Sequence, residues 1–220
     1  MKVLLFGASG MVGQGVLREC LLDPRVETVA MLVRNAMGQH HPKLREIVLP
    51  DIMTIETIAN ELSGYDACLF CIGVTSAGMS EPAYTKATYD LTLKVATLLA
   101  RVNLAMIFVY VSGQGTDSSE KGRLMWARVK GRTENALLRL PFKAAYMLRP
   151  GAIQPLYGIQ SKTGWYRALY AITGPIYPLL KRLIPHSITT TEQMGRAMIE
   201  VAANGHRKPI LETRDINAIR

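Results

Sequence analysis

Three glycines near the start of the chain have a spacing that can hold a phosphate group. They stand in the run Gly7-Ala8-Ser9-Gly10-Met11-Val12-Gly13, directly after a short apolar stretch. Gly7 permits a tight turn, Gly10 lets the backbone approach a pyrophosphate, and Gly13 lets the next helix pack close to the strand. The phosphates would then bind free amide groups at the helix N-terminus. We therefore predict that this turn binds a dinucleotide, with Ser9, Met11 and Val12 lining it beside the glycines.

The residue after the second apolar run indicates which dinucleotide is bound. A dinucleotide-binding fold normally has an acidic residue there, which holds the ribose 2′-hydroxyl. Here residues 28–33 are followed by Arg34, whose guanidinium suits a 2′-phosphate through bidentate charge-assisted hydrogen bonds. We therefore expect NADP rather than NAD, although a solvated arginine at a strand end is the alternative. Asp51 could accept a hydrogen bond from the adenine amino group, or it could only cap a short helix.

Short apolar runs alternate with helical patterns over most of the chain. The predicted strands cover residues 2–6, 28–33, 46–49, 67–71, 106–111 and 144–148. The predicted helices cover 12–22, 55–62, 82–102 and 121–140, and a later helix at 190–203 precedes a last strand at 209–211. Continuous apolar strands are typical of a parallel sheet that helices cover on both faces. The alternation thus predicts an α/β fold with a doubly wound, Rossmann-type parallel sheet.

The regular alternation ends in a proline-rich stretch. Six of the 11 prolines fall between Pro141 and Pro185. We expect one domain over residues 1–220, in which 151–190 form a small irregular substrate lobe at the carboxyl ends of the strands. The apolar segment 165–180, flanked by cations, is too short and too broken by glycine and proline to span a bilayer. We interpret it first as part of the lobe, second as a homodimer face and third as a membrane contact.

Positive charge is concentrated in one part of the chain. The net charge is +9, and residues 121–182 hold 12 basic side chains against a single acidic one, Glu134. Such a field could attract an anionic substrate, a membrane surface or nucleic acid, or it could be only a solvated surface. We expect no nucleic-acid partner, because the sequence has no recognition module, zinc spacing or aromatic-rich basic strand.

Several segments together resemble the short-chain dehydrogenase/reductase superfamily, in particular its atypical and extended branch. That branch includes NAD-dependent epimerase/dehydratase-like and NAD(P)H-binding oxidoreductase-like proteins. The resemblance covers essentially the whole chain. It rests on the glycine turn, Cys71-Ile72-Gly73, Val111-Ser112-Gly113, Lys130 and Leu148-Arg149-Pro150-Gly151.

The resemblance implies a role for each of these segments. Residues Cys71, Ile72 and Gly73 would line the ribose side of the cofactor. Ser112 would orient the substrate carbonyl, and Lys130 would hold the nicotinamide ribose, so that both belong to the catalytic site. The segment Arg149, Pro150 and Gly151 would lie beside the nicotinamide.

One position departs from the family pattern. The family pairs tyrosine and lysine as Tyr-x-x-x-Lys on one helix face, where the charged lysine favours the tyrosinate. This chain has Trp126 and Lys130 at that spacing. An indole N–H donates a hydrogen bond but cannot transfer a proton at accessible pH. Another group could donate the proton, the protein could bind cofactor without turnover, or the alignment could be off by one helical turn. Substitute acids exist in Tyr84, Tyr89, Tyr157, Tyr166 and Cys71, although each also fits a packing role.

The cysteines and histidines indicate no further chemistry. Three cysteines are too few for a disulfide scaffold and favour a reducing compartment. Without a visible signal peptide, we expect a cytoplasmic protein. Cys68 and Cys71 point to opposite faces of a strand, so we expect no metal site.

These observations lead to one main hypothesis and one rival. The first is an NADP(H)-binding oxidoreductase-like protein that acts on a small carbonyl or hydroxyl substrate. The rival is a catalytically silent cofactor-binding protein with a regulatory or scaffold role, in which Trp126 has abolished turnover. A peripheral membrane protein that uses residues 162–182 is a third alternative.

Overall fold

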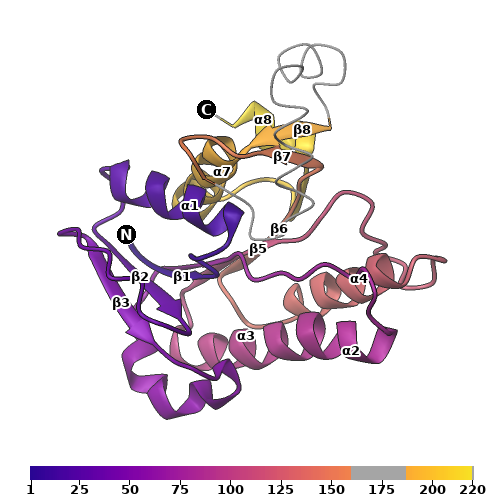
Figure 1. Cartoon of the computed structure of the whole chain (residues 1–220), viewed down its shortest axis with the longest axis horizontal. Coiled ribbons are helices and arrows are strands. Elements are labelled where there is room, and N and C mark those ends of the chain that lie inside the picture. The colour runs from indigo at the N-terminus through magenta and orange to yellow at the C-terminus, as the bar shows by residue number, and fades with distance from the viewer. Residues whose placement is uncertain (160–186, 220) are drawn as a thin grey trace.

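A seven-stranded sheet forms the centre of the computed structural model, which describes residues 1–159 and 187–219. Its strands lie in the order β3-β2-β1-β4-β5-β6-β9 (Figure 1), and each neighbouring pair is parallel. They are β1 (Lys2–Phe6), β2 (Thr28–Val33), β3 (Leu44–Val48), β4 (Ala67–Phe70), β5 (Ile107–Val111), β6 (Ala144–Arg149) and β9 (Ile210–Glu212). The predicted doubly wound α/β fold is confirmed.

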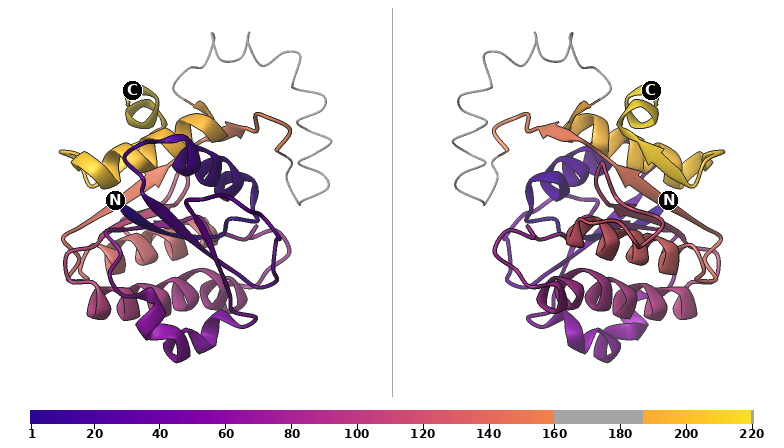
Figure 2. Two further views of the ribbon diagram at one scale, coloured as in Figure 1. Left: turned by 90° about the vertical axis from the view of Figure 1, so that its left-hand side faces the viewer. Right: turned by 90° about the vertical axis from the view of Figure 1, so that its right-hand side faces the viewer.

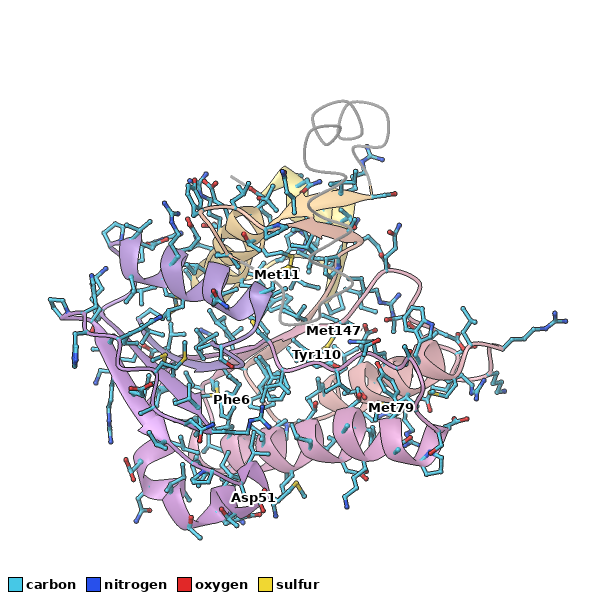
Figure 3. All side chains as sticks on the ribbon, in the orientation of Figure 1. Phe6, Met11, Asp51, Met79, Tyr110 and Met147 are labelled. Carbon is cyan, nitrogen blue, oxygen red and sulfur yellow. The ribbon has the colours of Figure 1, made fainter. Side chains whose placement is uncertain are left out.

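Helices cover both faces of this sheet (Figure 2). α1 (Met11–Leu22) and α7 (Thr191–Asn204) pack on one face, and α3 (Leu91–Val102) and α4 (Met125–Leu137) lie on the other. Side chains alternate along each strand, so that Leu5 joins the core beneath α1 and α7 whereas Phe6 and Tyr110 join the core beneath α3. Figure 3 shows Phe6 and Tyr110 on that second side. Burial on both faces explains why the strands read as continuous apolar runs.

The order of the strands places the ligand crevice. The chain leaves β1 in one direction toward β2 and later crosses to β4 on the other side, so the topology switches between β1 and β4. Ligands of open α/β sheets bind at the carboxyl ends of the strands at such a switch point. The glycine turn after β1 and the Cys71 turn after β4 both lie there.

The predicted bounds of the elements agree best with the structure in the long apolar strands. β1 and β2 have the predicted bounds, and the other strands differ from prediction by one or two residues at an end. Three predicted helices differ from the structure, two in the type of helix and one in where it begins. The helix at 55–62 is the 3₁₀ helix η1 (Ile52–Leu62), and the helix at 82–102 is α2 (Glu81–Thr85), the π-turn η2 (Lys86–Asp90) and α3 in succession.

The third difference is the start of α4, which begins at Met125 rather than at residue 121. The Asp117 carboxylate accepts hydrogen bonds from the amides of Ser119 and Gly122 at 3.0 and 2.6 Å. Glu120 adopts a left-handed φ of 62° inside this turn. The side chain of Asp117 thus competes with helix formation for the amides that follow it.

The predicted irregular lobe at 151–190 lies largely on residues 160–186, outside the described residues. Its two ends form the parallel pair β7 (Ala152–Gln154) and β8 (Ile188–Thr190), which the sequence did not indicate. The apolar segment 165–180 and Tyr166 also lie outside the described part of the chain. α8 (Thr213–Ala218) follows β9. No helix within the described ranges is long and apolar enough to cross a membrane.

Candidate functional site

The glycine turn is built so that two of its glycines have no room for a side chain. Gly7 has a φ of +83°, and a Cβ on it would lie 2.7 Å from the carbonyl carbon of Cys71. A Cβ on Gly13 would lie 2.0 Å from the Gly7 carbonyl oxygen. The turn after β1 therefore touches the turn after β4, and the first helical turn of α1 packs directly on Gly7.

The N-terminus of α1 faces this turn with amides that have no hydrogen-bond partner among the described residues. The first backbone hydrogen bond of the helix runs from the Gln14 amide to the Gly10 carbonyl at 2.9 Å. The amides of Met11, Val12 and Gly13 precede it and have no partner within the helix. Gly10 provides no side-chain cap, and the first turn of α1 contains no acidic residue. The partial positive charge of the helix end is therefore available to an anion, and the residues present fit a dinucleotide pyrophosphate.

The turn after β4 closes the other wall of the crevice. The Cys71 amide donates to the Phe6 carbonyl at 2.9 Å, which continues the β1–β4 pairing by one residue. The Cys71 thiol packs toward Met198 of α7, whereas Cys68 is buried on the α3 side of the sheet. Burial raises the pKa of both thiols, so neither is a reactive thiolate. Ile72 is partly buried and Gly73 is exposed.

Arg34 and Asp51 stand at the ends of neighbouring strands. Arg34 is exposed directly after β2, and among the described residues no acidic side chain pairs with it. The carboxylate of Asp51 accepts a hydrogen bond from the Met53 amide at 2.9 Å and caps η1. The capping alternative for Asp51 is therefore realised, and its contact with an adenine stays a prediction.

Ser112 lies one residue beyond β5 and is nearly fully buried. Its amide donates to the Leu148 carbonyl at 2.8 Å, and its Oγ lies 3.0 Å from Oγ1 of Thr116. Thr116 Oγ1 also donates to the Gly113 carbonyl at 2.7 Å. The sequence did not single out Thr116, which fixes the orientation of the Ser112 hydroxyl.

Lys130 and Trp126 both lie on α4, one helical turn apart, as predicted from their spacing. The Lys130 ammonium lies 5.4 Å from the centre of the ring of Tyr110, which belongs to the core beneath α3. Burial lowers the pKa of Lys130 to about 8, and Glu134 opposes this effect. The Trp126 ring packs beside Gly115, at about 3.5 Å from where a Cβ on that glycine would stand.

Arg149 makes a buried ion pair that the sequence did not reveal. Its Nε lies 3.0 Å and its Nη2 2.5 Å from the two carboxylate oxygens of Glu134, which is fully buried. Nη2 also donates to Ser118 Oγ at 2.6 Å, and Nη1 reaches Glu212 at 3.3 Å. The guanidinium ties α4 to β6 and β9, so any contact of Arg149 with a cofactor would have to come from its backbone.

Pro150 and Gly151 join the loops around the site. The Pro150 carbonyl accepts from the Gln114 amide at 2.9 Å, and the Gly151 amide donates to Thr213 Oγ1 at 2.8 Å. A Cβ on Gly151 would lie 2.2 Å from the Ser187 carbonyl oxygen. These contacts fix the loop after β6 against the loop after β5.

The tyrosines considered as substitute acids fall into two groups. Tyr84 is buried beneath α4, and burial raises its pKa. Arg132 stacks on the ring of Tyr89 at 4.3 Å. Tyr157 lies over α1, where Arg18 stacks on its ring at 3.6 Å and its hydroxyl donates to Glu192 at 2.8 Å. Among the described residues no group of three or more potential metal ligands gathers.

Comparison with known proteins adds the family context. No family model matches the chain. A protein of Emericella nidulans named fmp52, mitochondrial, is 30% identical over 159 residues, which are 69% of this chain and 66% of that protein. The chain thus spans just under two thirds of that relative's length. The leucinostatins biosynthesis cluster protein T of Purpureocillium lilacinum is 27% identical over 237 aligned positions, 94% of this chain and 87% of that protein.

Solved structures agree with the chain over nearly its whole length. A short-chain dehydrogenase family protein of Francisella tularensis superposes with a TM-score of 0.66 at 14% identity, covering 96% of this chain and 95% of that one. The chain has the fold of the short-chain dehydrogenase/reductase superfamily. MoeE5, in a complex with UDP-glucose and NAD, superposes with a TM-score of 0.68 at 15% identity, covering 99% and 80%. The resemblance stated from the motifs is thereby confirmed at the level of the fold.

The expected cytoplasmic location is contradicted by the relatives. The FMP52 proteins of Emericella nidulans and Candida albicans both carry the designation mitochondrial. The number of cysteines excludes a disulfide scaffold, but it does not distinguish one reducing compartment from another.

Proposed function

We propose that the protein is an NADP(H)-binding oxidoreductase that acts on a small carbonyl or hydroxyl substrate. The observation that carries the proposal is the turn at the switch point between β1 and β4. There Gly13 packs on the Gly7 carbonyl, and the uncapped amides of α1 are free for an anion. Neighbours with the same fold include one in a complex with NAD, which supports a nicotinamide dinucleotide as the ligand.

Each polar residue of the crevice has a defined task in this proposal. The amides at the start of α1 bind the pyrophosphate, and Arg34 binds the 2′-phosphate of the adenosine ribose. Lys130 donates hydrogen bonds to ribose hydroxyls, and Ser112 accepts a hydrogen bond from the reacting hydroxyl when the substrate is an alcohol. When bound, the cofactor supplies a hydride to the substrate carbon or accepts one from it.

Calorimetric titration with NADPH and NADH tests the cofactor and its phosphate preference. We expect Arg34→Gln to weaken NADPH binding about tenfold or more and to leave NADH binding within about twofold, because only NADPH loses a charge-assisted pair. Arg139→Gln is the matched control, since it removes an equal charge from an exposed position at the far end of α4. Absence of heat with both dinucleotides would overturn the proposal, and an unchanged NADPH affinity in Arg34→Gln would overturn the phosphate preference alone.

A second candidate function follows from Trp126. The indole occupies the helix position that the family's phenol takes in the resemblance, and its N–H does not transfer a proton at accessible pH. A cofactor-binding protein without turnover would serve as a regulatory or scaffold component. Tight NADPH binding without oxidation by any aldehyde or ketone of a broad panel favours this function, and reductase activity gained by Trp126→Tyr would strengthen it. NADPH oxidation by the parent chain excludes it.

A further inference from the structure

Among the described residues, we consider four groups at or near the end of β5 that carry an exchangeable proton. They are the hydroxyls of Ser112, Thr116 and Tyr110 and the ammonium of Lys130. Trp126 shares a helix face with Lys130 but has no accessible acid–base chemistry. Among the described residues, these four groups are therefore the candidates for supplying a proton to a reacting oxygen, beside water, and Tyr166 lies outside the described residues.

The hydroxyl protons of Ser112 and Thr116 are already committed. A carbonyl only accepts hydrogen bonds, so Thr116 must donate its proton to the Gly113 carbonyl 2.7 Å away. Ser112 must then be the donor in its 3.0 Å contact with Thr116. Ser112 consequently presents only lone pairs to a ligand, and it can accept a hydrogen bond but cannot supply a proton.

Tyr110 is also unsuitable. Its side chain is buried, its ring lies at a tilt against that of Phe70, and burial raises the pKa of its hydroxyl well above the ordinary value. Tyr84, buried on α2, raises it further. Of the four described groups, Lys130 remains, with its ammonium 5.4 Å from the centre of the Tyr110 ring.

The ammonium of Lys130 lacks the ion pair that its position on α4 suggests. Glu134 lies one turn further along the helix, but its two oxygens bind Arg149 at 2.5 and 3.0 Å. In the described ranges Lys130 forms no salt bridge, and the charged groups around it are Glu134 of α4 and, behind that carboxylate, Arg149 of β6. A partly buried ammonium without an ion pair releases its proton more readily than an exposed lysine.

We propose that Lys130 takes over the task of the missing phenol and donates the proton to the substrate oxygen. The inference rests on the proposed function. During reduction a hydride from NADPH forms the new C–H bond, the C=O π bond breaks, and its electron pair takes a proton from the Lys130 ammonium. The products are an alcohol, NADP⁺ and a neutral lysine, which water reprotonates. Ser112 accepts a hydrogen bond from the alcohol hydroxyl in the reverse direction.

The first test measures the protonation of Lys130 in the free protein. Nitrogen-15 NMR of the lysine side chains, with the signal assigned by its loss in Lys130→Arg, follows each ammonium through the pH titration. We expect Lys130 to titrate near pH 8, and Lys143→Arg, which removes an exposed lysine, is the control for the assignment. A Lys130 signal that titrates above about pH 10, like an ordinary lysine, would overturn the proposal.

The second test uses NADPH oxidation by a panel of aldehydes and ketones. Lys130→Arg keeps a positive charge for ribose hydroxyls, but a guanidinium cannot give up its proton. We expect kcat to fall about 100-fold or more while the Kd for NADPH changes by less than about threefold, and Trp126→Tyr in that background to restore activity. In the parent chain kcat should be constant below pH 8 and fall above it.

The outcomes separate this inference from the proposed function. Retained activity in Lys130→Arg contradicts the inference. NADPH binding by the parent chain without turnover on any member of the panel also contradicts it, while cofactor binding stands. A parent chain that binds no NADPH overturns the proposed function and this inference with it.

Discussion

The contact between Gly13 and Gly7 makes a prediction that separates folding from cofactor binding. A Cβ on Gly13 would lie 2.0 Å from the Gly7 oxygen, 2.6 Å from the Gly7 carbon and 2.9 Å from Ala8 Cα. Ordinary contacts begin at 3.4 Å, and all three atoms are backbone, so no rotamer change relieves them. Gly13→Ala must therefore push α1 away from the turn by about 1 Å.

The expected cost follows from two opposing effects. Overpacking costs about 1–3 kcal/mol or more, and alanine in place of glycine in a helix returns up to about 1 kcal/mol. We expect Gly13→Ala to lower the free energy of unfolding by about 2 kcal/mol and the melting temperature by about 4–8 °C. Binding of NADPH should be lost, because the amides of α1 no longer face the turn.

Gly10→Ala is the matched control in the same turn. Its Cβ would meet only the Gly7 oxygen, at 3.3 Å, and its φ of −84° is open to any residue. We expect its stability to change by less than about 1 kcal/mol, while NADPH binding weakens because the methyl group blocks the pyrophosphate. Urea denaturation with a constant m-value measures the first effect and calorimetry the second. A Gly13→Ala protein as stable as its parent would refute the packing argument. Undiminished NADPH binding by Gly10→Ala would refute the prediction that the pyrophosphate lies against the backbone of Gly10.

Two further predictions concern the charges buried beneath α4. Glu134→Gln removes the buried counter-ion of Arg149 and leaves only the longer contact with Glu212. We expect urea denaturation to show a free energy of unfolding lower by about 3 kcal/mol, partly recovered in the double variant Glu134→Leu/Arg149→Met; a Glu134→Gln protein as stable as its parent would contradict a stabilising ion pair. Because burial lowers the pKa of Lys130 from 10.5 to about 8, the folded chain is destabilised where the lysine is charged and gains stability between pH 8 and 10.5. Lys130→Met should therefore be more stable than its parent by up to about 3 kcal/mol at pH 7, and this advantage should shrink by pH 10; an advantage that does not change with pH would contradict the burial of the charge.

The sheet could be predicted because its signal is local. Each strand is a short apolar run whose burial on both faces follows from its own composition, so β1 and β2 have the predicted bounds. The start of α4 was misplaced because residues 121–124 permit a helix, whereas the Asp117 carboxylate holds the preceding turn. The Asp-Ser-Ser run at 117–119, followed by Gly122, was the available signal for that turn.

The site was predictable only where it depends on the backbone. The spacing of the glycines fits the close packing of α1 on Gly7, whereas dinucleotide binding at this turn stays a prediction. Glu134 and Arg149 are 15 positions apart in the sequence and meet only in the folded chain. No local sequence pattern predicts this ion pair. One signal was present, since Glu134 is the single acid in an otherwise basic block and follows Lys130 by one helical turn. The sequence contains no signal for the role of Thr116, because a threonine that orients a neighbouring hydroxyl cannot be distinguished there from any other loop threonine.

Two features of the crevice are unfavourable for the chain by itself, and one kind of ligand satisfies both. The start of α1 presents amides without an acidic cap, and Lys130 holds a partly buried ammonium whose neighbouring carboxylate is engaged by Arg149. Among the described residues, the amides of α1 lack an anion as a partner, and the Lys130 ammonium lacks oxygen atoms that accept its hydrogen bonds. A nicotinamide dinucleotide carries a pyrophosphate and, further along, ribose hydroxyls. Because an unsatisfied group gains more from a partner than a satisfied one, the two features add to the affinity for such a ligand. The same reasoning supports the proposal that Trp126 does not end the chemistry, because Lys130 forms no salt bridge with the described residues and burial lowers its pKa.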